Sequence, residues 1–161
     1  MNANNNFKTV IKKSTTDKLN IMLDTYAKIL NTTTETSIEV GKKYLQVNPV
    51  LRERYESLVS ELYYAKSYVN YLNSVNPELV MLYNMGMCDD YYYGSKREVS
   101  EAESNVEEIQ SKILAIETDS TNQLSKEIRS FVLKNKGQVL ISLIKEELDI
   151  RKSASIQSFE Q

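Results

Sequence analysis

The apolar residues of this 161-residue chain recur every three or four positions over two long stretches, which is the spacing of one face of an α-helix. The first stretch covers residues 14–75 and the second covers residues 95–157. Ser14 to Asp17 offer N-cap side chains ahead of the first stretch, and the run Thr32 to Thr34 lowers the helix propensity in its middle. At 1.5 Å per residue, each stretch would form a helix about 90 Å long.

One proline lies within the first stretch and a second lies just after it. Pro49 follows Asn48, so it is either the first residue of a new helix capped by Asn48 or a kink in one long helix. The apolar spacing continues through this point, which favours the kink. Pro77 repeats the signal and ends or bends the helix, and residues 76–94, which contain two glycines, are expected to form the loop between the stretches.

Two rods of equal length joined by a loop predict an all-α fold, a long antiparallel helical hairpin kinked at Pro49 and Pro77. In this hairpin, residue i of one rod faces a residue of the other rod numbered roughly 170 minus i. Such a hairpin has little core of its own, so its apolar stripes bury against each other and against a partner chain, which predicts a dimer or larger assembly. Residues 1–13, rich in Asn and Lys, are expected to form a flexible N-terminal arm ahead of one helical domain, residues 14–161. The predicted core and dimer stripe consists of Leu51, Tyr55, Leu58, Leu62, Val69, Leu72, Ile113, Ile116, Leu124, Ile128 and Phe131.

The composition fits a helical protein and argues against an enzyme. The chain is 41% apolar and 26% charged, with four Gly and two Pro, which is too apolar for a disordered segment and too poor in turn residues for a many-stranded β protein. It contains no His and a single Cys, Cys88, which excludes His-based acid–base chemistry and an intramolecular disulfide. Adjacent acidic pairs such as Glu107 and Glu108 point in different directions on a helix. We therefore expect no catalytic residues, no metal and no cofactor.

Charge is distributed unevenly along the chain, although the net charge is only -2. Between Glu98 and Asp119 seven acidic residues stand against Lys112 alone, and the sign reverses over residues 126–136. The hairpin register brings the second segment beside two lysines of the first rod, which gives a cluster of six cations: Lys42, Lys43, Lys126, Arg129, Lys134 and Lys136. Such a cluster is either a solvated helix face or a patch for an anionic surface, where each cation near acidic lipid is worth about 1 kcal/mol.

The placement of the tyrosines bears on the choice of partner. Most of them fall on the apolar stripes and not between the basic residues, so nucleic acid is not expected. Tyr91 to Tyr93 lie in the predicted loop, where aromatic rings suit either a bilayer interface or packing against the helix ends. No apolar run has the length of a signal peptide or a membrane span, and the lone Cys fits a reducing compartment, so we expect a cytoplasmic protein.

Residues 124–136 resemble the last helix of the BAR domain of sorting nexins, where a Glu, a hydrophobic residue, an Arg, any residue and a Phe precede a basic run. The matching positions are Glu127, Ile128, Arg129 and Phe131. The resemblance covers residues 15–161 and implies crescent-shaped dimers of long kinked helices that bind acidic endosomal membranes through a basic concave face. The positions that carry over to that face are Lys126, Arg129, Lys134 and Lys136. This chain has length for two of the three long BAR helices and lacks the phosphoinositide-binding PX domain of that family.

These observations together predict a non-catalytic, BAR-like protein that lies on acidic endosomal membranes in sorting or vesicle trafficking. It is expected to form a homodimer or a heterodimer with another helical or BAR protein. The alternative is a coiled-coil scaffold or adaptor that binds helical protein partners without membrane contact. A third hypothesis, a regulatory protein of a mobile element or virus that blocks another protein, is neither supported nor excluded by the sequence.

Overall fold

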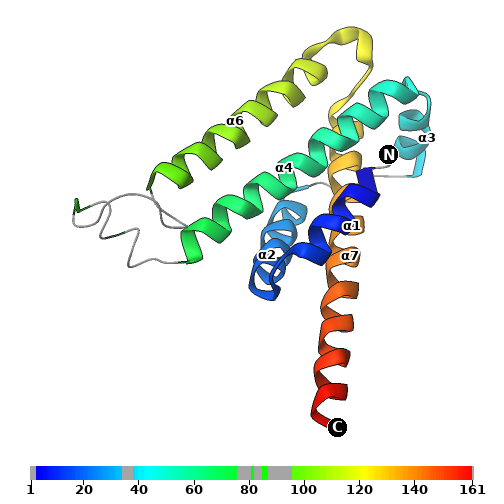
Figure 1. Ribbon diagram of the computed structural model, residues 1–161. Helices are drawn as coiled ribbons and strands as arrows, with labels where there is room; N and C mark the ends of the chain where they lie inside the picture. The colour runs from blue at the N-terminus through cyan, green and yellow to red at the C-terminus, as the bar shows by residue number, and fades with distance from the viewer. Residues whose placement is uncertain (1–2, 34–37, 76–80, 82–84, 87–95, 161) are drawn as a thin grey trace.

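The computed structural model describes residues 3–33, 38–75, 81, 85–86 and 96–160. Within these ranges the chain forms six α-helices, one short 3-10 helix and no strand, which confirms the predicted all-α class. The elements are α1 (Ala3–Lys13), α2 (Thr16–Asn31), α3 (Ile38–Leu45), α4 (Pro49–Val75), α6 (Lys96–Thr118), η1 (Ser120–Asn122) and α7 (Lys126–Glu160) (Figure 1). Pro77, Cys88 and Tyr91 to Tyr93 lie outside the described residues, as does most of the predicted loop.

Hydroxyl side chains at the helix ends divide the first predicted rod. The Thr15 hydroxyl accepts a hydrogen bond from the Lys18 amide at 3.2 Å and caps α2. At the other end, the Thr32 hydroxyl donates to the Ile29 carbonyl at 2.7 Å, so the threonine run marks the end of α2. The single helix expected over residues 14–75 is therefore corrected to three helices, α2, α3 and α4.

Pro49 starts α4 and does not kink a longer helix. The side-chain oxygen of Asn48 accepts a hydrogen bond from the Val50 amide at 2.9 Å, which is the bond of an N-cap. Proline suits the first helical position because an N–H there would have no partner within the helix. Of the two interpretations of this proline, the capped start is confirmed and the kink is wrong.

A second interruption separates α6 from α7. The Asp119 carboxylate accepts hydrogen bonds from the hydroxyl and the amide of Thr121, at 2.6 and 3.0 Å, and both bonds lower the pKa of this carboxyl group. Gln123 then adopts a left-handed backbone with φ of 56°, and the Ser125 hydroxyl accepts an N–H of the first turn of α7 at 3.3 Å. The single helix expected over residues 95–157 is therefore corrected to α6, η1 and α7.

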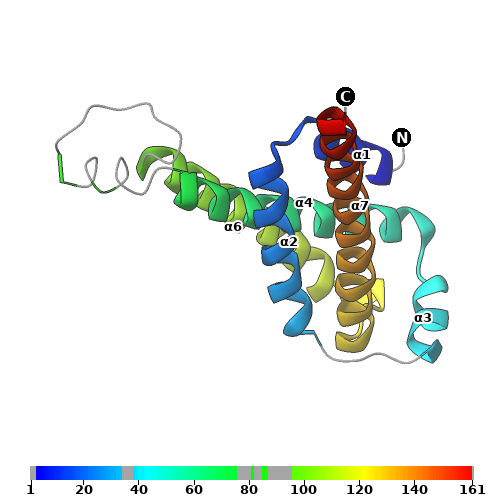
Figure 2. The same ribbon diagram turned by 90° about the horizontal axis from the view of Figure 1, so that it is seen from below.

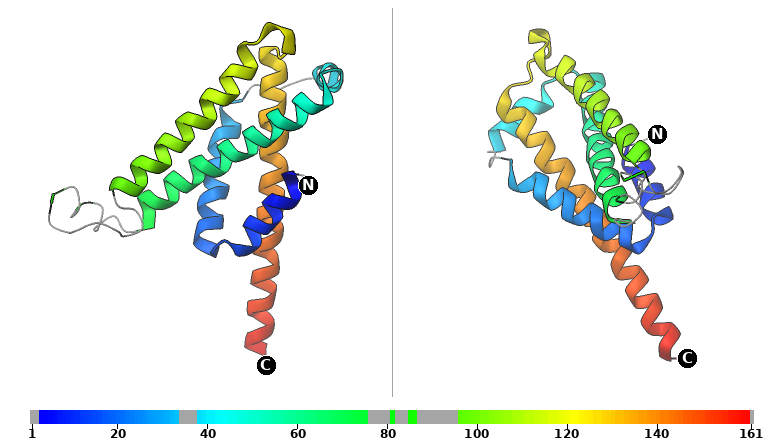
Figure 3. Two further views of the ribbon diagram at one scale, coloured as in Figure 1. Left: turned by 45° about the horizontal axis from the view of Figure 1, so that its top comes forward. Right: turned by 90° about the vertical axis from the view of Figure 1, so that its left-hand side faces the viewer.

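α4 lies at the centre of the molecule, with α6 along one side and α2 and α7 along the other (Figures 1 and 3). α4 and α6 run in opposite directions, since the Tyr55 hydroxyl near the start of α4 donates to Glu117 near the end of α6, at 2.6 Å. Consistently, the Tyr68 hydroxyl, later in α4, donates to Glu98 near the start of α6, at 3.0 Å. We refer to these two helices as the α4–α6 pair.

α2 and α3 lie one after the other along α7, and both run antiparallel to it. The Arg151 guanidinium, late in α7, donates to the Thr16 hydroxyl at the start of α2, at 3.2 Å. Gly41 of α3 lies against the Phe131 ring, early in α7. These pairs, like those between α4 and α6, fall within a few residues of the register predicted for the hairpin.

The two interruptions, at residues 46–48 and residues 119–125, face each other in that register. At these points the α4–α6 pair folds back, and α4 covers a side of α2 and α7 that an extended hairpin would leave open (Figure 3). The expected pair of long kinked rods is thus replaced by shorter helices in two layers. The folding back supplies the core that a simple hairpin lacks.

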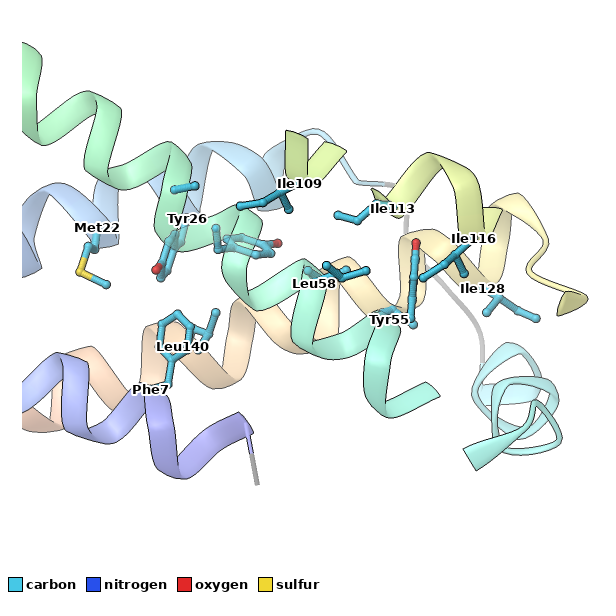
Figure 4. Packing of buried hydrophobic residues seen from close by; sticks show 14 of the residues in the cluster. Phe7, Met22, Tyr26, Tyr55, Leu58, Ile109, Ile113, Ile116, Ile128 and Leu140 are labelled. Atoms are coloured by element: carbon cyan, nitrogen blue, oxygen red, sulfur yellow. The ribbon is translucent and has the colours of Figure 1, made fainter. Parts of the chain in front are cut away.

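Aromatic side chains from α2 and α4 meet α7 at the centre of this core. Tyr26 of α2 and Leu140 of α7 lie close together in the core (Figure 4), and both are buried, as is Tyr63 of α4. The rings of Tyr26 and Tyr63 are perpendicular, with centroids 4.9 Å apart, a favourable aromatic arrangement. The Tyr63 hydroxyl donates to the Leu133 carbonyl at 2.7 Å, which ties α4 to α7.

Residues 3–13 form a helix that joins the core, in place of the flexible arm expected from the sequence. Phe7 and Ile11, one turn apart, are buried, and the Phe7 ring meets the Tyr64 ring edge-on at a centroid distance of 6.5 Å. The Arg151 guanidinium donates to the Ile11 and Lys12 carbonyls at 3.3 and 3.2 Å. α1 is therefore fastened to both α4 and α7.

Candidate functional site

α3 lies at the edge of the molecule (Figure 2), and its outer face combines exposed apolar and basic side chains. Ile38, Lys42 and Leu45 recur at helical spacing on this face, and the two apolar side chains are 83% and 65% exposed. The inner face carries Tyr44, whose ring packs on the Phe131 ring of α7 at a centroid distance of 5.8 Å. α3 is thus held to the fold by one face while it presents apolar side chains outward on the other.

Further exposed side chains lie on α3 and on the ends of the two helices that adjoin it, α4 and α7. Val50 in the first turn of α4 is exposed, and so are Lys43 and Lys126, the latter at the end of α7 that α3 covers. α3 itself carries one acidic residue, Glu39, in its first turn. We define the α3 surface as Ile38, Lys42, Lys43, Leu45, Val50 and Lys126.

The structure separates the six cations that were predicted to lie together. Three of them are exposed and belong to the α3 surface: Lys42, Lys43 and Lys126. Lys134 is half-buried, and Lys136 is only 8% exposed and interacts with other groups of the chain. Arg129 is half-buried and forms an ion pair with Glu117. The exposed basic residues are therefore fewer than predicted, and they lie on α3 and in the first turn of α7.

A hydrogen-bonded cluster at the junction of α4, α6 and α7 explains the position of Arg129. One oxygen of Glu117 accepts from the Tyr55 hydroxyl at 2.6 Å, and the other lies 3.4 Å from Nη1 of Arg129. Burial, reinforced by the hydrogen bond and charge of Glu117, raises the pKa of Tyr55. Nε of Arg129 is buried and has no hydrogen-bond partner. Arg129 thus joins helices inside the fold and is poorly placed to contact a membrane.

The predicted apolar stripe is covered within a single chain. Its members are buried (Tyr55, Leu58, Leu72, Ile113, Ile116, Leu124 and Ile128) or half-buried (Leu51, Leu62, Val69 and Phe131). Figure 4 shows the isoleucines of α6 beside Leu58 and Tyr55 of α4. Because the α4–α6 pair folds back, burial of this stripe requires no partner chain.

A row of tyrosines around Lys18 is a feature that the sequence did not reveal. The rings of Tyr64, Tyr68 and Tyr71 on α4 follow one another with centroids 6.4 and 6.5 Å apart. Nζ of Lys18 lies 5.1 to 5.6 Å from the three centroids and donates to the Tyr64 hydroxyl at 2.9 Å. The three- and four-residue spacing marks the row, but no sequence signal places Lys18 of α2 beside it. The contact ties α2 to α4 through cation–π and hydrogen-bond interactions.

Two open grooves flank α4 where α6 stands away from the neighbouring helices. One, with a volume of about 430 Å³, lies between α1, α4 and α6 and includes Phe7 and Ile109. The other, of about 490 Å³, lies between α2, α4 and α6 and includes Ile29 and Val106. Both linings mix apolar, hydroxyl and charged side chains.

Within the described ranges, no cluster of three or more His, Cys, Asp or Glu side chains is arranged to hold a metal ion. In the same part of the chain, no helix combines the length and the apolar character needed to span a membrane. The protein families, curated proteins and solved structures compared with this chain include no match.

Proposed function

We propose that this protein is a non-catalytic peripheral membrane protein that binds anionic bilayers through the α3 surface. The observation that carries the proposal is the outward position of Ile38 and Leu45 beside Lys42 and Lys43. Apolar side chains next to lysines suit the boundary between headgroups and acyl chains, where the apolar groups leave water and the lysines meet lipid phosphates. In a chain of net charge -2, such a surface also orients the molecule toward an anionic bilayer.

The expected affinity is modest. The three lysines contribute about 1 kcal/mol each near acidic lipid. Complete burial of an exposed Ile, Leu or Val side chain contributes about 1.5–3 kcal/mol, and these side chains enter the headgroup region only in part. Orienting the protein opposes these gains by several kcal/mol. The balance corresponds to reversible, salt-sensitive binding.

The proposal concerns binding to the membrane and not its bending. A BAR domain presents a basic face along long rods, whereas the α3 surface is compact and both rods are interrupted, at residues 46–48 and 119–125. From the resemblance of residues 124–136 we retain the cytoplasmic face of endosomes as the cellular setting of the proposal. Phosphoinositide-containing vesicles are therefore included in its test.

Vesicle co-sedimentation tests the proposal. The protein is mixed with vesicles of phosphatidylcholine alone, or with added phosphatidylserine or phosphoinositide, at low and at physiological salt. We expect binding only to the acidic vesicles, and less of it at higher salt. Lys42→Glu combined with Lys43→Glu should weaken binding at least about tenfold, because two cations near the lipid become anions. Ile38→Ser combined with Leu45→Ser should weaken it at both salt concentrations.

Lys12→Glu combined with Lys13→Glu is the matched control. Both of these lysines are exposed at the end of α1, and the double change alters the net charge by the same amount. This variant should bind almost as well as the natural chain. Equal losses in the two charge-reversed variants would contradict the α3 surface as the contact site. Failure of the natural chain to bind acidic vesicles would refute the proposed function itself.

A scaffold that binds a helical protein partner is the second candidate, and the end of α7 favours it. α7 extends past α1 (Figure 1), and Ile150, which borders a groove against α1, is 56% exposed. An exposed apolar side chain on a projecting helix suits docking against another helix. Under this alternative, vesicles are not bound, and Ile150→Asp reduces recovery of the partner while the Lys42 and Lys43 changes do not.

A further inference from the structure

We propose that two copies of this chain form a dimer by exchanging their α4–α6 pairs, so that α4 of each copy packs on α2 and α7 of the other. The α4 helix that packs on α2 and α7 of one copy then belongs to the second copy of the same chain. This inference concerns assembly and goes beyond membrane binding, on which it does not rest.

The connectivity allows the α4–α6 pair to move as a unit. The pair is joined to the other helices at two places, residues 46–48 and residues 119–125. Both connections lie at the same end of the pair, because Tyr55 near the start of α4 bonds to Glu117 near the end of α6. The pair can therefore swing away from α2 and α7 without passing one connection through the other.

The contacts that would be exchanged are specific and join residues far apart in the sequence. The Tyr63 hydroxyl of α4 donates to the Leu133 carbonyl of α7 at 2.7 Å. The side-chain amide of Asn70, also on α4, donates to the Thr25 hydroxyl of α2 at 2.8 Å. In an exchanged dimer the same bonds form between two copies, so both the polar contacts and the buried apolar area are retained.

The antiparallel pairing of the helices on the two sides of the interruptions supports an open form, in which the α4–α6 pair has swung away from α2 and α7. Gly41 lies against Phe131 on one side, and Tyr55 bonds to Glu117 on the other, and both pairs belong to one antiparallel register. Opening at both connections would therefore extend the chain into the hairpin that its apolar spacing describes, with each half still paired. The side of α2 and α7 that opening uncovers is the side that α4 of a second copy fits.

Backbone strain at residues 119–125 favours the open form, whereas Pro49, at the other connection, favours the closed form. Gln123 holds a φ of 56°, a left-handed conformation that disfavours side chains other than Gly, Asn and Asp. A helical path through residues 119–125 relieves this strain, and no Gly or Pro in that segment opposes it. Pro49 opposes a continuous helix at the other connection, because its ring would clash with the Leu45 carbonyl. Pro49 is thus expected to keep the closed monomer populated.

A cross-link between α2 and α4 tests for exchange directly. Thr25→Cys and Asn70→Cys are combined with Cys88→Ser, and the monomer and dimer are separated by size-exclusion chromatography with light scattering. Each fraction is then treated with a short thiol-to-thiol reagent and run on a denaturing gel. In an exchanged dimer, residue 25 of one copy lies beside residue 70 of the other, so the gel shows covalent dimers. A dimer in which every link stays within its own chain overturns the proposal.

Hinge variants provide the second measurement. Gln123→Gly relieves the strain of the closed form and disfavours the helical path, so it should lower the dimerisation constant about tenfold. Gln123→Ala keeps the strain and is the matched control, with an unchanged constant. Pro49→Ala should raise the constant at least about tenfold. A chain that stays monomeric at every concentration, with Pro49→Ala as well, also overturns the proposal.

Discussion

Gly137 offers the sharpest test of how α7 packs. This glycine lies inside a helix, where replacement by Ala should stabilise the helix by about 1 kcal/mol on propensity alone. The fold predicts the opposite, because a Cβ at this position would lie 2.7 Å from Cδ2 of Leu30 and 2.7 Å from the hydroxyl oxygen of Tyr63. α2 and α4 both approach the α7 backbone here, and a methyl group has no room between them.

The size of the effect follows from what must move. The Tyr63 hydroxyl is held by its 2.7 Å bond to the Leu133 carbonyl, so displacing it forfeits about 0.5–1.5 kcal/mol. Overpacking of a filled core costs about 1–3 kcal/mol. After the gain in propensity, Gly137→Ala should lower the free energy of unfolding by about 1–3 kcal/mol, or the Tm by about 2–4 °C for each kcal/mol.

Chemical denaturation followed by circular dichroism measures this change. Gly41→Ala is the matched control, because its Cβ would lie 3.1 Å from the Phe131 ring, which is half-buried and can shift. We expect this control to be neutral or slightly stabilising. Adding Tyr63→Phe to Gly137→Ala should cost less than the sum of the two single changes, since the Tyr63 oxygen is one of the two obstacles to the added methyl group. If Gly137→Ala is more stable than the natural chain, the close approach of the three helices is refuted.

Two further predictions concern the cluster at the junction of α4, α6 and α7 and the buried tyrosines. Arg129→Glu should lower the free energy of unfolding by about 1–3 kcal/mol, because it places a carboxylate beside Glu117. Lys126→Glu, on the exposed surface, should leave the free energy of unfolding nearly unchanged. Equal stabilities of the two variants in denaturation would contradict the placement of Arg129 inside the fold. Burial raises the pKa of Tyr55 and Tyr63, so the unfolded chain releases these phenol protons first, at a pKa of about 10. The free energy of unfolding should be constant below about pH 10 and should fall above it by up to about 1.4 kcal/mol per pH unit for each tyrosine. Denaturation curves that do not change above about pH 10 would contradict this prediction.

The periodic pattern predicted the helices well because apolar burial repeats every three or four residues wherever a helix packs on a neighbour. It predicted the pairing of Tyr55 with the end of α6 within a few residues. It could not locate the turn at Gln123, because a left-handed residue that is not Gly leaves no mark in the sequence. At Pro49 the local capping chemistry outweighed the continued apolar spacing, and a helix began there.

The candidate site shows the same division between local pattern and tertiary position. The lysines of α3 were identified by charge, but the register placed them with Arg129 and Lys136, which the folding back of α4 and α6 turns inward. The apolar side chains Ile38 and Leu45 lie off the main stripe, and only the tertiary structure shows that they face outward. Burial is a property of the whole fold, so a one-dimensional pattern assigns it poorly for short helices.

The attachment of α1 to α7 has a consequence for the order in which the chain can fold. Arg151 reaches carbonyl oxygens near the N-terminus, across 140 residues of sequence. α1 and α2 leave the ribosome before α7, against which both pack. Until α7 has been synthesised, the apolar faces that α1 and α2 bury against it have no permanent cover, so the stable tertiary structure of this region forms only after that point.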